Sequence, residues 1–409
     1  MLNKTFHTKA HFYLAILIAF CLPFARLTPI FIALMLLNWL LEGDLKNKFQ
    51  IIYKNKFALL FIAFYGMHLI GMLYTKNINS GWFDLQVKFS LLLFSIILSS
   101  RPFNNKDIDT IFLSFIGGGV LSSIILLGRA IYLYITLGSM DIFFYQAFAF
   151  FLHPSYLSMY LNVAIVWLLI KIVNNKFASQ RFSNFLAFLI ILFFSFIIAL
   201  LSSKIGLITM ILTYICFLMY FIISKKKYII GISGILIIII SIYYVMRFVP
   251  EINARVSRAI SVVTSSTTNQ ADAESTAVRL LVWKASAQVI SENLLLGAGT
   301  GDVKDVLMKE YEKRGMTGAI EHKLNAHNAF YQVFVGLGLI GFLLLILSLL
   351  LPLVFAFKTN NFIYLFFLII IILNFLTESM LESEAGVMFY AFFNSLLCFQ
   401  TTINPQSKI

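Results

Sequence analysis

Charged residues are scarce in this sequence of 409 residues. They make up 12% of it, whereas 60% of the residues are hydrophobic and the mean hydropathy is +0.90. A soluble domain usually carries about 25% charged and about 45–50% apolar residues. Water could not solvate such a surface, so the expected solvent is a lipid bilayer, and we expect one integral membrane domain.

Cysteine is also rare, and its positions argue against a metal or disulfide role. Cys21, Cys216 and Cys398 each fall inside an apolar run, and none has metal-ligand or disulfide spacing to another. We therefore expect packing residues. Neither a metal nor another cofactor is among the predictions. The first apolar run lacks a small-residue cleavage site, so we expect it to remain as the first membrane helix.

Basic residues outnumber acidic ones, with a net charge of +13, but their placement does not suggest nucleic acid. They form short clusters between apolar runs, as topology determinants do. Interleaved basic and aromatic residues of a nucleic-acid-binding face are missing. The excess charge therefore bears on membrane orientation.

The apolar runs predict an all-α polytopic membrane protein with about 12 transmembrane helices. The segments are 11–25, 28–42, 57–74, 84–99, 108–137, 154–173, 184–201, 205–223, 228–248, 327–357, 361–377 and 386–402. This pattern divides the chain into nine helices in 1–248, a large extracytoplasmic loop at 249–326, and three helices in 327–409.

Lysine and arginine lie mostly on one side of this arrangement. With a cytoplasmic N-terminus, the cytoplasmic segments carry Lys4, Lys9, Lys46, Lys48, Lys54, Lys56, Arg101, Lys106, Lys171, Lys176, Arg181, Lys225, Lys226, Lys227, Lys358 and Lys408. The short external loops hold only Arg26, Lys76 and Lys204. The positive-inside rule then predicts that both termini are cytoplasmic.

The large loop contains the most informative polar pattern. Residues 277–290 have helical apolar spacing, which predicts an amphipathic helix at the membrane surface. Gly297, Gly299 and Gly301 predict a turn, because the spacing does not fit a nucleotide-binding fingerprint. Asp302 is expected to cap a second helix that ends near Arg314.

Three external residues stand out as candidates for chemistry: Lys204 after the seventh helix, Arg279 four residues before Trp283, and His327, which precedes Asn328. Each also has an ordinary interpretation. A lysine can extend to the lipid headgroups, an arginine can lie on the polar face of a helix, and a histidine at a membrane boundary is more often structural.

Together, these motifs resemble the O-antigen ligase and polymerase family. The resemblance rests on Arg279 to Trp283, on Asn293-Leu294-Leu295-Leu296-Gly297-Ala298-Gly299-Thr300-Gly301-Asp302, and on His327-Asn328 leading to Gly336-Leu337-Gly338-Leu339-Ile340-Gly341. Two softer matches are His153-Pro154-Ser155-Tyr156-Leu157-Ser158 and Thr377-Glu378-Ser379. The fold implied is the GT-C-like O-antigen ligase fold.

The resemblance implies a metal-independent transfer of a glycan from undecaprenyl diphosphate to a sugar hydroxyl. The acceptor is lipid A-core for a ligase and another glycan repeat for a polymerase, at the periplasmic face of a bacterial inner membrane. His327 would engage the acceptor, and Arg279 and Lys204 would hold the diphosphate. Lys204 departs from the family, which commonly has arginine there, and lysine offers a point charge rather than a fork.

Other polar residues are weaker candidates for substrate binding: Asn328, His153, Tyr156, Lys88 and Glu378. Lys88 and Arg129 fall inside predicted helices, where a charge is costly, so pairing with an internal carboxylate is at least as good an interpretation. Glu378 and Glu382 would share a face if their loop were helical.

Three alternatives stay open from the sequence. A polymerase shares the motifs of a ligase. A membrane transporter or lipid flippase also has about twelve helices, although it tends to show paired repeats. A non-catalytic scaffold could keep the fold without the reaction.

Overall fold

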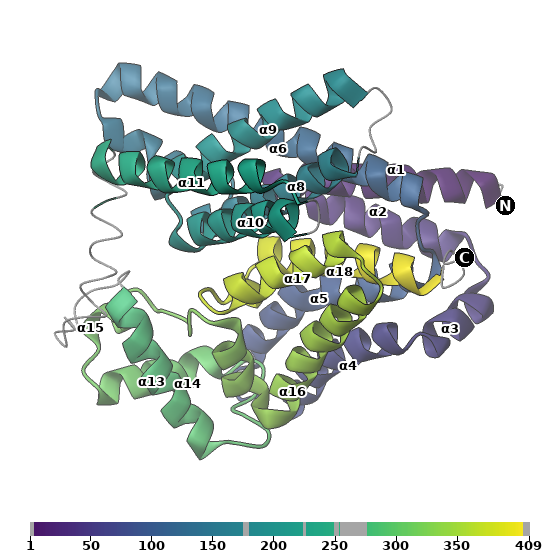
Figure 1. Ribbon diagram of the computed structural model, residues 1–409. Helices are drawn as coiled ribbons and strands as arrows, with labels where there is room; N and C mark the ends of the chain where they lie inside the picture. Colours follow the sequence, from purple (N-terminus) through teal and green to yellow (C-terminus); the bar gives the residue numbers. More distant parts are fainter. Residues whose placement is uncertain (1–3, 175–179, 224–225, 249–252, 254–275, 404–409) are drawn as a thin grey trace. The chain divides into compact units, whose positions relative to one another are not determined.

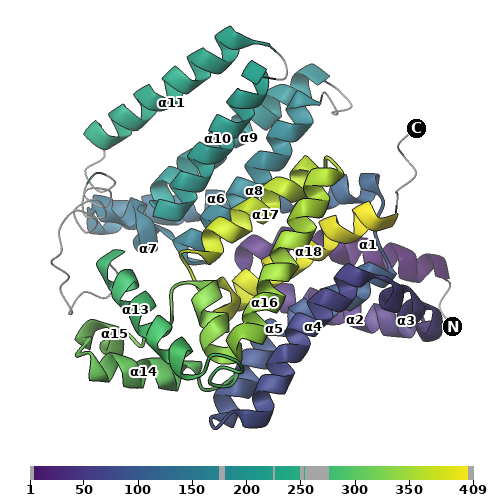
Figure 2. The same ribbon diagram turned by 60° about the horizontal axis from the view of Figure 1, so that its bottom comes forward.

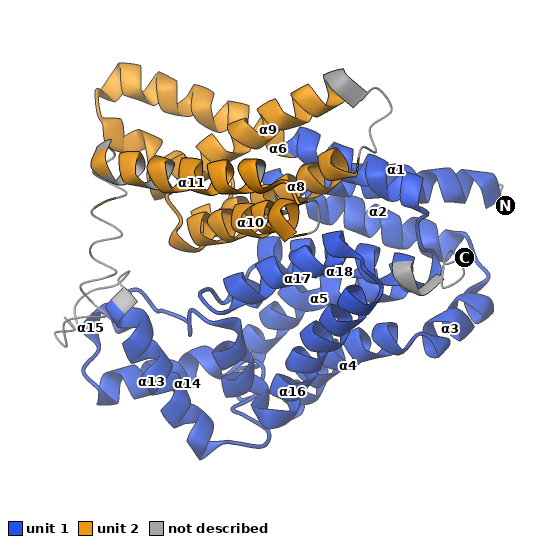
Figure 3. Cartoon of the chain, viewed as in Figure 1, with its two compact units in different colours: residues 1–118, 268–409 blue, residues 119–267 orange. Residues whose placement is uncertain are grey.

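The computed structural model describes residues 4–174, 180–223, 226–248, 253 and 276–403. In this part of the chain the secondary structure is helical, with no strand. The chain divides into two compact units, residues 1–118 with 268–409 and residues 119–267 (Figure 3). The boundary falls within one long helix, α6, Asn105–Leu137.

The first unit contains most of the helices (Figure 1). They are α1 (Lys4–Cys21), η1 (Leu22–Phe24), α2 (Thr28–Leu41), α3 (Leu45–Lys54), α4 (Lys56–Gly71), η2 (Met72–Tyr74), α5 (Ile78–Ser100), the start of α6, α13 (Thr276–Glu292), α14 (Val303–Lys313), α15 (Thr317–Glu321), α16 (Ala329–Lys358), α17 (Phe362–Phe375), η4 (Met380–Glu382) and α18 (Glu384–Ile403). Of the predicted loop 249–326, residues 249–252 and 254–275 lie outside the described part.

The second unit continues α6 and adds six further elements. They are η3 (Met140–Phe143), α7 (Tyr145–Phe148), α8 (Pro154–Val173), α9 (Gln180–Leu201), α10 (Lys204–Ile223) and α11 (Tyr228–Phe248). Pro154 is the first residue of α8, a position where the missing N–H of proline has no helical partner to lose.

Every predicted segment coincides with a helix, but the count of twelve spans is not confirmed. Eight helices in the described residues are long and apolar enough to cross a membrane, or nine if the bent pair α2 and α3 is one span. That pair bends by 112°, where Gly43 and Asp44 have positive φ angles. Helix α17 has 14 residues, whereas a span of the roughly 30 Å hydrocarbon core takes about 20.

These helices make the chain a multi-pass membrane protein. In the first unit α4 and α5 run side by side, and α16 and α18 pack against them (Figure 2). Aromatic rings fill the contact between α6 and α18, where Phe115 lies 4.9 Å from Phe393 between ring centroids. Close packing of large rings is what holds these helices together in a solvent as apolar as their side chains.

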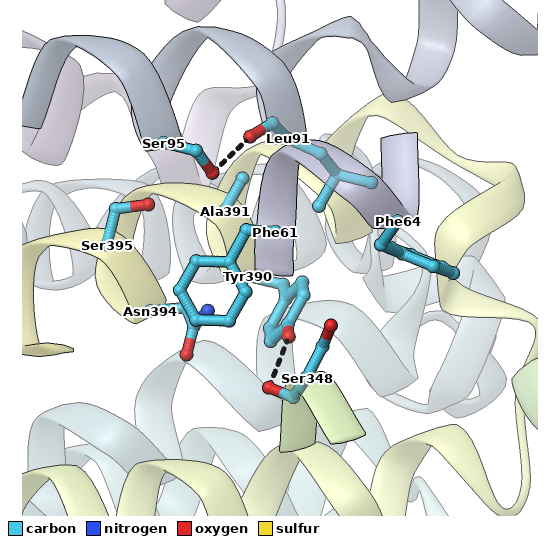
Figure 4. A pocket seen from close by; sticks show the side chains of 9 residues that line it. All are labelled: Phe61, Phe64, Leu91, Ser95, Ser348, Tyr390, Ala391, Asn394 and Ser395. Carbon is cyan, nitrogen blue, oxygen red and sulfur yellow. Dashed lines mark hydrogen bonds between the residues drawn. The ribbon is translucent and has the colours of Figure 1, made fainter. Parts of the chain in front are cut away.

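A small polar pocket interrupts this packing. Its volume is about 10 Å³, and it is lined by Phe61, Phe64, Leu91, Ser95, Ser348, Tyr390, Ala391, Asn394 and Ser395 (Figure 4). The space suffices for about one water molecule. The hydroxyl of Ser348 is buried and has no hydrogen-bond partner among the described residues.

Candidate functional site

Arg279 is positioned by α13, which is anchored by an apolar face. Val278, Val282, Ala285 and Val289 are buried in a core shared with α14, α15 and the start of α16. The ring of Trp283 stacks on that of Tyr331, with 6.1 Å between centroids. Because that core fixes the rotation of α13 about its axis, the Arg279 side chain lies on the partly exposed face of the helix.

His327 lies immediately before α16 in an unusual backbone conformation. Its φ angle is 44°, a left-handed value that costs a non-glycine residue about 1–3 kcal/mol. The side chain of Asn325 accepts a hydrogen bond from the His327 N–H at 2.9 Å. Asn328 then caps α16 by accepting hydrogen bonds from the N–H groups of Phe330 and Tyr331.

The loop after α17 brings Glu378 to both Arg279 and His327. Glu378 Oε1 lies 2.7 Å from Arg279 Nη2, and Glu378 Oε2 lies 3.4 Å from His327 Nδ1. Asn328 holds this loop through two hydrogen bonds: its side-chain amide donates to Leu376 O, and its backbone N–H donates to Ser379 Oγ. Three residues distant in sequence therefore meet in one cluster within the first unit.

This cluster has the geometry for proton transfer. A carboxylate at Nδ1 favours the tautomer with the proton on that nitrogen, which leaves Nε2 with a lone pair. The His327 side chain is 24% exposed and that of Arg279 is 26% exposed, so both are open to a ligand. The guanidinium has five N–H donors, and the pair with Glu378 engages Nη2, so donors remain for an anion.

Lys88 occupies a different environment from that cluster. Its side chain is 1% exposed and forms ion pairs with Asp84 on α5 and, at 2.8 Å, with Glu382 in η4. His68 Nδ1 on α4 lies 3.5 Å from the other oxygen of Asp84. The structure thus gives Lys88 the carboxylate partners that the sequence left open, and it sends Glu378 and Glu382 to different cations.

Lys204, His153 and Tyr156 belong to the second unit. Lys204 begins α10 and is partly buried. His153 precedes α8, where its Nδ1 accepts from the N–H of Ser155, and its ring lies 5.9 Å from that of Tyr156. Ser203 Oγ donates to Ser155 Oγ at 3.3 Å, so the turn before α10 meets the start of α8.

Asp302 corrects one expectation. It stands at the N-cap position of α14, but its side chain makes no capping hydrogen bond there. Its two carboxylate oxygens instead accept from the backbone N–H groups of Lys76 and Asn77, at 2.8 and 2.7 Å. The residue joins the start of α14 to the turn between α4 and α5.

Sequence reasoning missed residues that support the two environments: Asn325 and Gln332 beside His327, and Asp84 and His68 beside Lys88. The side chain of Asn325 accepts from the N–H of His327, and that of Gln332 accepts from the N–H of Ala326. Asp84 had a detectable signal, because a carboxylate four residues before a lysine on a helix is a favourable pair. Asn325 had none, since its role depends on the turn conformation.

The described helices and this cluster define a multi-pass membrane protein with an arginine, a carboxylate and a histidine assembled outside its spanning helices. Residues 186–346 match the model of a family described as O-antigen ligase. The match runs from α9 into α16 and includes Lys204, Arg279 and His327. The resemblance to the O-antigen ligase and polymerase family is thereby confirmed over these residues, and no curated protein was found to match the chain.

Proposed function

We propose that this protein is an O-antigen ligase-type glycosyltransferase that moves a glycan from undecaprenyl diphosphate to a sugar hydroxyl of lipid A-core. The observation that carries the proposal is the meeting of Arg279, Glu378 and His327 in one partly exposed cluster. The family match over residues 186–346 supports the ligase or polymerase class of reaction.

The proposed step breaks one bond and forms one. The acceptor hydroxyl attacks the anomeric carbon of the donor glycan, and the bond from that carbon to the diphosphate oxygen breaks. Undecaprenyl diphosphate leaves with the electron pair, and the hydroxyl proton passes to Nε2 of His327. Histidine suits this role because its pKa lies near neutrality in water.

Arg279 is proposed to stabilise the leaving diphosphate. Negative charge grows on the bridging oxygen as the bond breaks, and a fixed cation is worth most where charge develops. Glu378 has a positioning role, because one carboxylate orients both the guanidinium and the imidazole. Lys204 is proposed as a further phosphate-binding cation on the resemblance alone, and His153, Tyr156 and Asn328 as substrate contacts.

The finer topology is part of the same proposal. Twelve spanning helices are proposed from the apolar runs, and cytoplasmic termini with an external cluster from the one-sided distribution of lysine and arginine. The bacterial inner membrane is proposed from the resemblance. On this topology the cluster faces the side on which flipped lipid-linked glycans present their head groups.

The test is a gel of surface glycolipid from a deletion strain complemented with wild type or with His327→Ala. A ligase predicts bare lipid A-core in the deletion strain, long chains retained on the polyprenyl carrier, and no rescue by His327→Ala. Lipid A-core carrying a single repeat would identify a polymerase instead. An unchanged glycolipid pattern would contradict both.

A second measurement separates the enzyme from a transporter or flippase. Purified protein in liposomes is given a lipid-linked glycan and an acceptor on the accessible side. The proposal predicts a new glycosidic bond without prior movement of either lipid across the bilayer. Movement of lipid with no bond formed would remove the glycosyltransferase assignment.

A further inference from the structure

The turn between α13 and α14, residues 293–302, lies against helices that are candidates to span the membrane. Its Leu294 O accepts a hydrogen bond from Leu339 N of α16 at 2.8 Å, and Thr300 Oγ1 donates to His68 O of α4 at 2.7 Å. Residue 339 is ten residues inside the candidate span Ala329–Lys358, and residue 68 lies inside the span Lys56–Tyr74. The turn therefore lies beside both candidate spans.

Part of the backbone of the turn is satisfied by the protein. Ala298 N donates to Val335 O at 2.8 Å and Gly299 N donates to Gly336 O at 2.9 Å, while Gly297 N donates back to Asn293 O. Irregular backbone at membrane depth is tolerated only where protein meets its hydrogen-bonding groups. The N–H groups of Gly297, Ala298 and Gly299 fulfil that condition.

Glycines allow the close approach. A Cβ on Gly297, where φ is +73°, would lie 2.5 Å from Gly338 N, and a Cβ on Gly338 would lie 2.3 Å from Leu295 O. Gly338 has a φ of 62° inside α16, which is where the helix kinks. The turn and the kink therefore fit each other, and the turn is held in a defined position.

The side chains of the same turn point away from the protein. Leu294, Leu295 and Leu296 are 51%, 63% and 50% exposed, although the surrounding segment is polar. Exposed Ile340 and Leu343 of α16 follow the Leu339 contact, and exposed Leu73 precedes Tyr74, whose hydroxyl donates to Leu296 O. The three leucines therefore continue the apolar outer surface of α4 and α16.

We propose that Leu294–Leu296 form an apolar wedge inserted into the lipid bilayer, with acyl chains as the partner of these side chains. Leucine side chains left in water forgo the free energy of apolar burial, and the continuity of these three with two candidate spanning helices gives them lipid as a neighbour. Because the wedge follows α13 directly, it sets the depth at which α13 meets the headgroup region.

The test places a fluorescent label at Leu295→Cys and, as a matched control, at exposed Lys309→Cys on α14, with the three native cysteines replaced by alanine. Each protein is reconstituted in phosphatidylglycerol–phosphatidylethanolamine nanodiscs. The proposal predicts that nitroxide-labelled phospholipid quenches the label at residue 295 several-fold more than at 309, and that aqueous iodide shows the reverse order.

Equal quenching by iodide at the two positions would overturn the proposal, because it would place the leucines in water. Shielding of residue 295 from both quenchers would also overturn it, since a second copy of the chain would then cover the leucines. Size-exclusion chromatography of each labelled protein confirms that the fold persists. Since Leu295 is already 63% exposed, the label displaces no packed neighbour.

Discussion

Two carboxylates four residues apart in one loop serve two different environments. Glu378 pairs with Arg279 and His327, whose side chains are about a quarter exposed. Glu382 pairs with Lys88, whose side chain is 1% exposed, beside Asp84 and His68. The first cluster exposes its cation, whereas the second encloses its cation, Lys88, although the Glu382 side chain is itself 27% exposed.

The difference in exposure between Arg279 and Lys88 sets how much stability each ion pair contributes. A partly exposed ion pair contributes little to stability, typically about 0–1 kcal/mol, so breaking the pair of Arg279 with Glu378 costs little. Breaking a buried pair leaves charge without compensation and costs about 3–5 kcal/mol. The ion pair of Lys88 with Glu382 therefore fixes the loop after α17 against α5. The pairs that Glu378 makes with Arg279 and His327 are partly exposed.

The largest effect that would sharpen this comparison is expected from His327→Ala. Loss of the proposed base should lower the rate of glycan transfer by about 10²–10⁴-fold, measured with purified protein and a lipid-linked donor. Thermal unfolding in detergent should stay close to wild type. A variant that keeps wild-type turnover would contradict the assignment of His327.

The next largest effect is expected from Lys88→Met, which removes the buried cation and leaves Asp84 and Glu382 facing each other. We expect a loss of about 3–5 kcal/mol in the free energy of unfolding, seen as a lower melting temperature and yield. Lys88→Arg, which keeps the charge, is the control. A Lys88→Met protein as stable as wild type would contradict the prediction that the ion pairs of Lys88 contribute more to stability than those of Arg279.

Arg279→Ala is expected to lower transfer by about 10²–10³-fold, because the cation that meets the diphosphate is gone. Arg279→Lys should recover part of this rate, since it keeps the charge but not the planar fork. Both variants should unfold at nearly the wild-type temperature. Equal rates for wild type and Arg279→Ala would remove Arg279 from the donor site.

The smallest effect is expected from Tyr311→Phe in α14. Tyr311 is fully buried, burial raises the pKa of its hydroxyl, and that hydroxyl has no hydrogen-bond partner among the described residues. Its removal should change the free energy of unfolding by less than about 0.5 kcal/mol or stabilise slightly, measured by thermal unfolding. A large loss in the free energy of unfolding of Tyr311→Phe would show that a buried polar group without charge is as sensitive to substitution as Lys88.

The positions of the helices could be predicted well from the sequence, because runs of apolar residues mark the segments that are buried away from water. The prediction of 327–357 compares with Ala329–Lys358, and that of 205–223 with Lys204–Ile223. The number of spans was harder, since a 14-residue helix such as α17 and a bend such as that after α2 depend on neighbours. Length and composition do not encode those neighbours.

The candidate site was only partly predictable for a similar reason. Arg279 and His327 were selected by resemblance, and their roles stay predictions. The bridging of both by Glu378 depends on contacts across 99 and 51 residues of sequence. Asp302 shows the limit most clearly, because its position before a helix is what a cap requires, yet tertiary contact gives its carboxylate other N–H groups.

The hydrogen bonds from the turn between α4 and α5 to Asp302 affect how that turn unfolds locally. The amide protons of Lys76 and Asn77 are both engaged by one carboxylate on the neighbouring α14 turn, and Asn77 also donates to Asp305. Neither amide can exchange with solvent until that carboxylate withdraws. The α4–α5 turn and the start of α14 therefore open and close as one cooperative unit, although more than two hundred residues separate them.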